Sequence, residues 1–210
     1  TTAPGPPKKK SSGLKSPPAR LSPAVPPTGP VRAATAEDRE LAGRAVAACQ
    51  LAARRQRDQE ALVAAGQMLD DALALADLAG TPAEQRAELL LERGIARGVT
   101  GDPAGALADL GAATGSGRAA VRTQAWTELS NLHGMLGRYA ESSVAGDRAL
   151  VEATEAGDPA LIAQAVRVKA YVPYLAGDLA AAERLLEEAL GQARRAGRAD
   201  LGVELRATLL

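Results

Sequence analysis

The sequence predicts an all-α protein, and three observations support this class. Hydrophobic residues make up 46% of the 210 residues, but only 2% of the chain is aromatic and Phe is absent. Ala and Leu, which favour helices most strongly, supply most of the apolar side chains. Residues that start and stop helices recur along the chain, and a pattern of small and large residues repeats through it. No segment has the composition of a β-strand.

Composition divides the chain into two predicted regions. Residues 1–34 are rich in Pro, Ser, Gly and Lys, and they contain six basic residues and no acidic one. Because such a segment buries too little apolar surface to offset the entropy lost on ordering, we predict a disordered N-terminal linker. Residues 35–210 are predicted to form one helical domain. Since the whole chain has as many basic as acidic residues, this domain is acidic.

The first helices of the domain are predicted from residues that cap helix N-termini. Thr35 is expected to cap the first helix, because acidic residues follow it in the first turn. In the segment TPAE at 81–84, Thr81 is the expected N-cap, Pro follows it, and Glu84 completes a capping box. These signals predict helices near residues 36–56, 60–79 and 82–99.

Glycine and proline mark the later helices. The segment GDP, at 101–103 and again at 157–159, supplies a Gly stop, an Asp cap and a Pro start. A flexible turn, GAATGSG at 111–117, is expected to end a short helix, and single glycines separate the hairpin partners that follow. These signals predict helices near residues 103–114, 118–136, 138–156, 159–176, 178–196 and 199–210.

A repeat becomes visible when Gly101, Gly137 and Gly177, separated by 36 and 40 residues, are used as anchors. Small residues stand seven positions before each anchor and three, five and twelve positions after it, whereas a large apolar residue stands eleven before. Two helices that cross closely need small side chains at the crossing and a large one beside it. An earlier copy of the pattern has Glu60 at the anchor instead of glycine. The repeat therefore predicts successive helical hairpins.

The clearest copy is W-x-x-L-S-N-L-H-x-x-x-G-R-Y-x-E-S at 126–142, which resembles the tetratricopeptide repeat (TPR) family. The resemblance covers roughly residues 46–196, about three and a half hairpins, with a final helix after them. It implies an α-solenoid of antiparallel hairpins whose concave face is lined by the first helix of each pair. Three positions depart from the family pattern: Arg93 and Lys169 replace a usual Leu, and Gly146 replaces a large apolar residue.

The chain offers no recognisable catalytic or metal-binding constellation. It has one Cys, Cys49, and one His, His133, and we expect both to serve packing. No P-loop motif is present, and adjacent acidic pairs such as Asp70–Asp71 point in different directions on a helix. We therefore predict a non-enzymatic protein that has no catalytic residues, no metal site and no cofactor.

The expected binding surface follows from the family resemblance, which places certain first-helix positions in the concave groove. An amide, a cation and two phenol rings there are side chains that anchor peptides. The alternative is that these side chains are ordinary helix surface. The predicted groove residues are Thr127, Asn131, Arg167, Tyr171 and Tyr174.

The predicted function is a protein–protein interaction module that binds a peptide or partner helix. An alternative remains open, because the Ala/Arg/Leu/Gly-rich composition is also similar to C-terminal repeat arrays of ATP-dependent transcriptional regulators and signalling enzymes whose catalytic part lies upstream. The helix expected at 199–210 would mark a truncated array or a self-association edge. Nucleic-acid binding is expected to be at most weak and to involve the basic linker. No apolar run approaches the roughly 18 residues of a membrane span, so a cytoplasmic location is expected.

Overall fold

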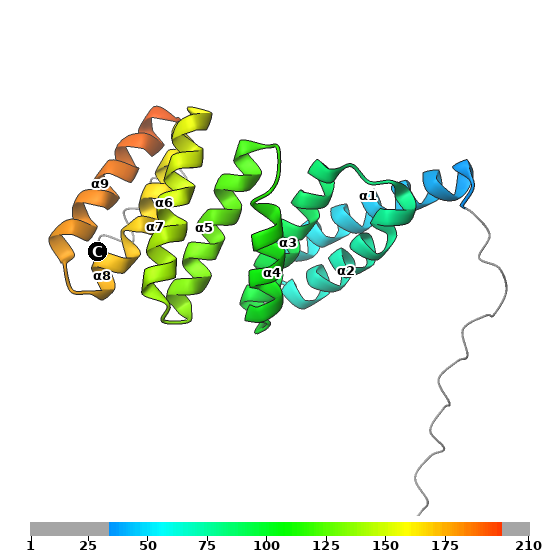
Figure 1. The fold of residues 1–210 in the computed structure, drawn as a ribbon, viewed down its shortest axis with the longest axis horizontal. Helices are drawn as coiled ribbons and strands as arrows, with labels where there is room; N and C mark the ends of the chain where they lie inside the picture. Colours follow the sequence, from blue (N-terminus) through cyan, green and yellow to red (C-terminus); the bar gives the residue numbers. More distant parts are fainter. Residues whose placement is uncertain (1–33, 199–210) are drawn as a thin grey trace, which may run out of the picture. The chain divides into compact units, whose positions relative to one another are not determined.

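The computed structural model describes residues 34–198, and all regular secondary structure in this range is helical (Figure 1). The predicted linker, apart from its last residue, and the predicted helix at 199–210 lie outside the described residues. The helices are α1 (Ala36–Asp58), α2 (Leu62–Ala79), α3 (Ala83–Thr100), α4 (Pro103–Ala113), α5 (Ala119–Met135), α6 (Tyr139–Ala156), α7 (Pro159–Lys169), α8 (Tyr171–Leu175) and α9 (Leu179–Arg195).

Each helix packs mainly against its neighbours in the chain. The closest pairs are α1 with α2, α3 with α4, α5 with α6, and α7 with α9, and each pair also packs against the next one. In addition, α5 contacts both α3 and α7, so these three helices lie side by side. The core is accordingly divided into clusters of Ala, Leu and Val that follow one another along the chain. The all-α prediction is confirmed, and the helical part is repeat-like.

The anchor positions of the repeat adopt left-handed backbone conformations. Gly101, Gly137 and Gly177 have φ angles of 92°, 71° and 79°. Glu60, the anchor of the earlier copy, has a φ of 61° and is the only non-glycine residue with positive φ in the described range. All four anchor positions thus share the left-handed backbone conformation, even where the sequence lacks the glycine that this conformation favours.

Most of the small positions of the repeat are close-packed, as predicted. Five residues after the glycine anchors, Ala106, Ser142 and Ala182 are at most 3% exposed. The residues twelve positions after the anchors and those seven positions before them are buried as well. The alanines three residues after the anchors (Ala104, Ala140 and Ala180) are exposed, so close packing does not explain them.

Hydrogen bonds replace apolar packing where α5 crosses α6. Ser130 Oγ donates to the Ser142 carbonyl at 2.7 Å, and Ser142 Oγ donates to the Ser130 carbonyl at 2.8 Å. Gly146 lies at the same crossing, where an added Cβ would stand 3.3 Å from Ser130 Oγ and 3.2 Å from Lys169 Cγ. This crossing has no room for the large apolar residue that the family resemblance led us to expect at 146.

Three of the predicted helix starts are confirmed and one is wrong. Thr35 forms a capping box with Asp38, and the Asp caps of both GDP segments accept hydrogen bonds from backbone N–H groups of α4 and α7. Thr81 does not cap α3, whose N-cap residue is Pro82. Glu84 accepts hydrogen bonds from Ser116 Oγ at 2.8 Å and from the Gly117 N–H at 3.1 Å, and the first of these is the main reason its pKa is lowered. The glycine-rich turn is therefore tied to the start of α3.

The helix expected at 159–176 is interrupted. It consists of α7 and the short α8, which are separated at Ala170. Pro173 explains the break, because proline has no N–H to donate to the carbonyl of Lys169 and its ring crowds that carbonyl. The tyrosines at 171 and 174 consequently belong to a separate helical turn. No helix in the described part of the chain is both long and apolar enough to span a bilayer.

Candidate functional site

Four of the five predicted groove residues line one pocket of about 260 Å³. Asn131 comes from α5, Arg167 from α7, and Tyr171 and Tyr174 from α8. Apolar side chains complete the lining: Val168, Ala170 and Leu186. We refer to this site as the tyrosine pocket.

The ring of Tyr171, which lines the tyrosine pocket, packs against α5. Gly134 of α5 lies directly against the Tyr171 ring, since a Cβ added to this glycine would stand 2.6 Å from Tyr171 Cε1. Tyr171 and Tyr174 are three residues apart in α8, so they lie on the same side of one helical turn. Tyr171 is 37% exposed and Tyr174 58% exposed, so both rings remain available to a partner.

Polar groups at the tyrosine pocket are incompletely paired. Arg167 makes no ion pair with any described residue, and its Nε atom is buried without a hydrogen-bond partner. Asn131 Nδ2 donates to Glu128 Oε2 at 3.4 Å, a long and weak bond. An unpaired buried donor is unusual in a folded protein, because its desolvation is not compensated.

Glu128 is an ionisable neighbour of the site that the sequence analysis did not identify. Burial raises the pKa of its carboxyl group, while the hydrogen bond from Asn131 and the positive charge of Arg167 act in the opposite direction. The available signal was its spacing, because Glu128 lies three residues before Asn131 and therefore on the same face of α5. Nothing in the sequence indicated its burial.

Thr127 does not belong to the tyrosine pocket, so its assignment to the groove surface was wrong. Its side chain is 3% exposed, and its Oγ1 donates to the Thr123 carbonyl at 2.8 Å. The equivalent residue of the preceding repeat, Leu91, is also buried. In both repeats the residue at this position is buried, whereas the longer side chain of Arg167 is only half-buried.

The two residues that could have suggested catalysis lie elsewhere. His133 is half-buried on α5; burial lowers its pKa, and its Nδ1 has no hydrogen-bond partner. Cys49 is half-buried against the cluster between α1 and α2. Within residues 34–198 no group of three or more His, Cys, Asp or Glu side chains is placed to hold a metal ion.

A second pocket, of about 570 Å³, lies on the α3 side of α5, and we refer to it as the arginine pocket. Arg54 of α1 pairs with Glu92 at 2.8 Å, and Arg118 pairs with Glu88. Arg57 also lines this pocket and forms no ion pair within the described range. The remaining lining residues are Leu91, Ile95, Ala120, Val121 and Gln124.

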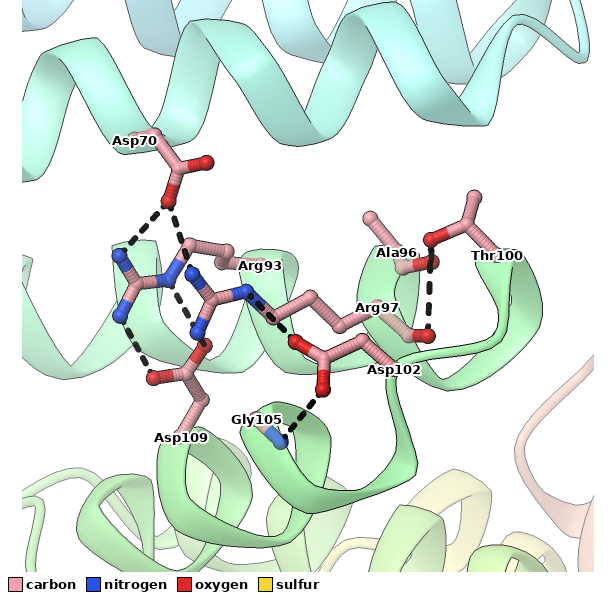
Figure 2. Close-up of polar contacts among 8 residues, drawn as sticks. All are labelled: Asp70, Arg93, Ala96, Arg97, Thr100, Asp102, Gly105 and Asp109. Atoms are coloured by element: carbon pink, nitrogen blue, oxygen red, sulfur yellow. Dashed lines mark hydrogen bonds and ion pairs between the residues drawn. The ribbon is translucent and has the colours of Figure 1, made fainter.

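The densest cluster of charges is a closed network between α2, α3 and α4 (Figure 2). Arg93 binds Asp109 through two hydrogen bonds of 2.7 and 2.6 Å, which raise the pKa of the arginine, and Arg97 binds the same carboxylate at 3.0 Å. Both arginines also bind Asp70, at 2.9 and 3.0 Å. These charges pair with one another, so the cluster joins three helices.

Comparison of the sequence with models of known protein families finds no match, and comparison with curated proteins finds none.

Proposed function

We propose that the helical domain is a TPR-like α-solenoid that acts as a non-catalytic interaction module. The succession of helix pairs, each packed on the next, supports the solenoid arrangement. In such an arrangement the side-by-side helices α3, α5 and α7 present one continuous face. A peptide or partner helix would lie across this face.

The observation on which this proposal rests is the tyrosine pocket. Residues from three repeat positions, up to 43 residues apart between Asn131 and Tyr174, meet around one cavity that apolar side chains also line. Pockets of this kind, with amphipathic rings and few but specific polar groups, favour peptide side chains as ligands. The half-exposed rings and the unpaired guanidinium remain available for contact.

The test is a selection of random displayed peptides on the purified chain, repeated on two triple variants. The groove variant combines Asn131→Ala, Arg167→Ala and Tyr171→Ala. The control variant combines Val144→Ala, Arg148→Ala and Val151→Ala, which truncate three exposed side chains of α6. We expect peptides that bind the wild type and the control variant equally but lose at least about tenfold in affinity for the groove variant. Recovery only of peptides that bind all three proteins equally would contradict the proposed function.

A further inference from the structure

The two pockets lie on opposite sides of α5: the arginine pocket on the side of α3, and the tyrosine pocket on the side of α7. Gln124 lines the arginine pocket and Asn131 lines the tyrosine pocket. These residues are seven positions apart, which is close to two helical turns, so their side chains leave the same face about 10 Å apart along the axis. An occupant of both pockets would therefore cross α5 and continue on its other side.

Each pocket contains one arginine without an internal partner. In the arginine pocket, Arg54 pairs with Glu92 and Arg118 pairs with Glu88, whereas Arg57 forms no ion pair with a described residue. In the tyrosine pocket Arg167 forms no ion pair with a described residue, and its buried Nε lacks a hydrogen-bond acceptor. Guanidinium groups of this kind bind carboxylates strongly, because charge and directional N–H donors act together.

The neighbouring Glu128 does not provide that acceptor. The positive charge of Arg167 partly offsets the rise in the pKa of Glu128, so the two side chains are near each other. They nevertheless form no ion pair within 4 Å. Burial is the largest influence on this carboxyl group and favours its neutral form. The positive charge of Arg167 is therefore incompletely balanced from within the protein.

The apolar part of the tyrosine pocket adds a second requirement. Val168, Ala170 and Leu186 line it together with the two phenol rings. A fully charged or fully polar segment would leave this apolar surface without a matching group. An aliphatic or aromatic side chain covers it and removes it from water.

We propose that the bound segment bears a Glu or Asp side chain that pairs with Arg167, next to an apolar side chain that packs against Leu186. The inference rests on the proposed function, since it assumes that a peptide occupies this face. We favour the carboxylate of a Glu or Asp side chain over the C-terminal carboxylate of the segment. The reason is that the arginine pocket, with its own unpaired arginine, extends the surface beyond α5. The segment passes through the site and does not end there.

The same peptide selection tests this inference through the sequences that it yields. We expect peptides dependent on the tyrosine pocket to share an acidic residue beside an aliphatic or aromatic one. Changing that acidic residue to its amide in a synthetic peptide is expected to weaken binding to the wild type by about tenfold or more. In the protein, Arg167→Gln should remove the difference between the acid and amide peptides, whereas Arg167→Lys should keep part of it.

The outcomes separate the inference from the function on which it rests. Pocket-dependent peptides that lack an acidic residue, or whose acid and amide forms bind equally to the wild type, would overturn the inference and leave the function in place. Pocket-dependent peptides that require a free C-terminal carboxylate instead would also overturn it. An absence of pocket-dependent peptides would overturn both. The comparison of acid and amide peptides uses unaltered protein, so it does not depend on the folding of any variant.

Discussion

Glu60 shows how a repeat can impose a backbone conformation on an unsuited residue. Its φ of 61° places a side chain in the left-handed region, where Cβ crowds the backbone. We predict that Glu60→Gly raises the free energy of unfolding by about 0.5–1 kcal/mol, measured by chemical denaturation. Glu60→Ala keeps the Cβ and is expected to give no comparable gain. Equal stabilisation by both variants would show that the backbone is not the cause.

Gly94 is required for the opposite reason, because a neighbouring helix fills its space. A Cβ at this position would stand 2.7 Å from Leu110 Cγ and 3.2 Å from the Leu110 backbone nitrogen. We predict that Gly94→Ala lowers the free energy of unfolding by about 2 kcal/mol. Gly43 has no heavy atom within 4 Å of an added Cβ, so Gly43→Ala should instead raise helix stability by up to about 1 kcal/mol. Thermal denaturation of both variants checks this contrast, and a stable Gly94→Ala protein would contradict it.

Glu128 predicts a pH-dependent contribution to stability. Its pKa is raised in the folded protein by burial, so the folded state binds the proton more tightly than the unfolded state. The stability from this group is complete below the usual Glu pKa and is lost as pH rises through the raised value. The free energy of unfolding of Glu128→Gln relative to wild type should therefore increase from acidic to neutral pH. A difference that stays constant across this pH range would contradict the assignment.

Between elements, charged pairs explain two departures from the family pattern. Arg93 and Lys169 lie at equivalent repeat positions, and each pairs with an Asp on the last helix of the preceding pair. Arg93 binds Asp70 at 2.9 Å, and Lys169 binds Asp147 at 2.7 Å. The sequence showed only that a usual Leu was missing. The acidic partner became evident once the helices were placed next to each other.

The network in Figure 2 gives a stability prediction for the α3–α4 pair. Asp109 is 5% exposed and binds both Arg93 and Arg97. Asp109→Ala leaves two cations without their shared buried acceptor, so we predict a loss of about 3 kcal/mol in the free energy of unfolding. Asp70→Ala, at the more exposed end, should cost about 1 kcal/mol or less. Equal losses in urea denaturation would contradict this ranking.

Local signals predicted the helices well where a single residue decides the boundary. Thr35 and the two GDP segments act as expected because a cap needs only its own turn. The TPAE segment was misinterpreted because Glu84 binds a turn more than thirty residues away. The break before α8 had a local signal, Pro173, which the prediction of a continuous helix did not take into account. Thr127 was misplaced because a repeat position does not specify how far each side chain reaches.

At the scale of the whole described domain, packing follows chain order. Helices contact mainly their neighbours, and the core consists of successive small clusters in place of one large centre. The face formed by α3, α5 and α7 borders two cavities, and each cavity is lined by one arginine without an ion pair in the described range. These are Arg57 of α1 and Arg167 of α7. The family resemblance indicated four of the residues that line the tyrosine pocket, but it also indicated Thr127, which does not line it. The proposed chemistry of a bound segment rests on how the charges around these cavities are paired, which the sequence did not show.

The most direct test of the proposed binding face is an NMR titration of the isotope-labelled chain with the tightest displayed peptide. The account predicts that amide shifts concentrate around Asn131, Arg167, Tyr171 and Tyr174, and extend across α5 toward Gln124. The outer residues of α6, such as Val144 and Arg148, should remain unchanged. Shifts concentrated on α6, with none around the tyrosine pocket, would contradict the account.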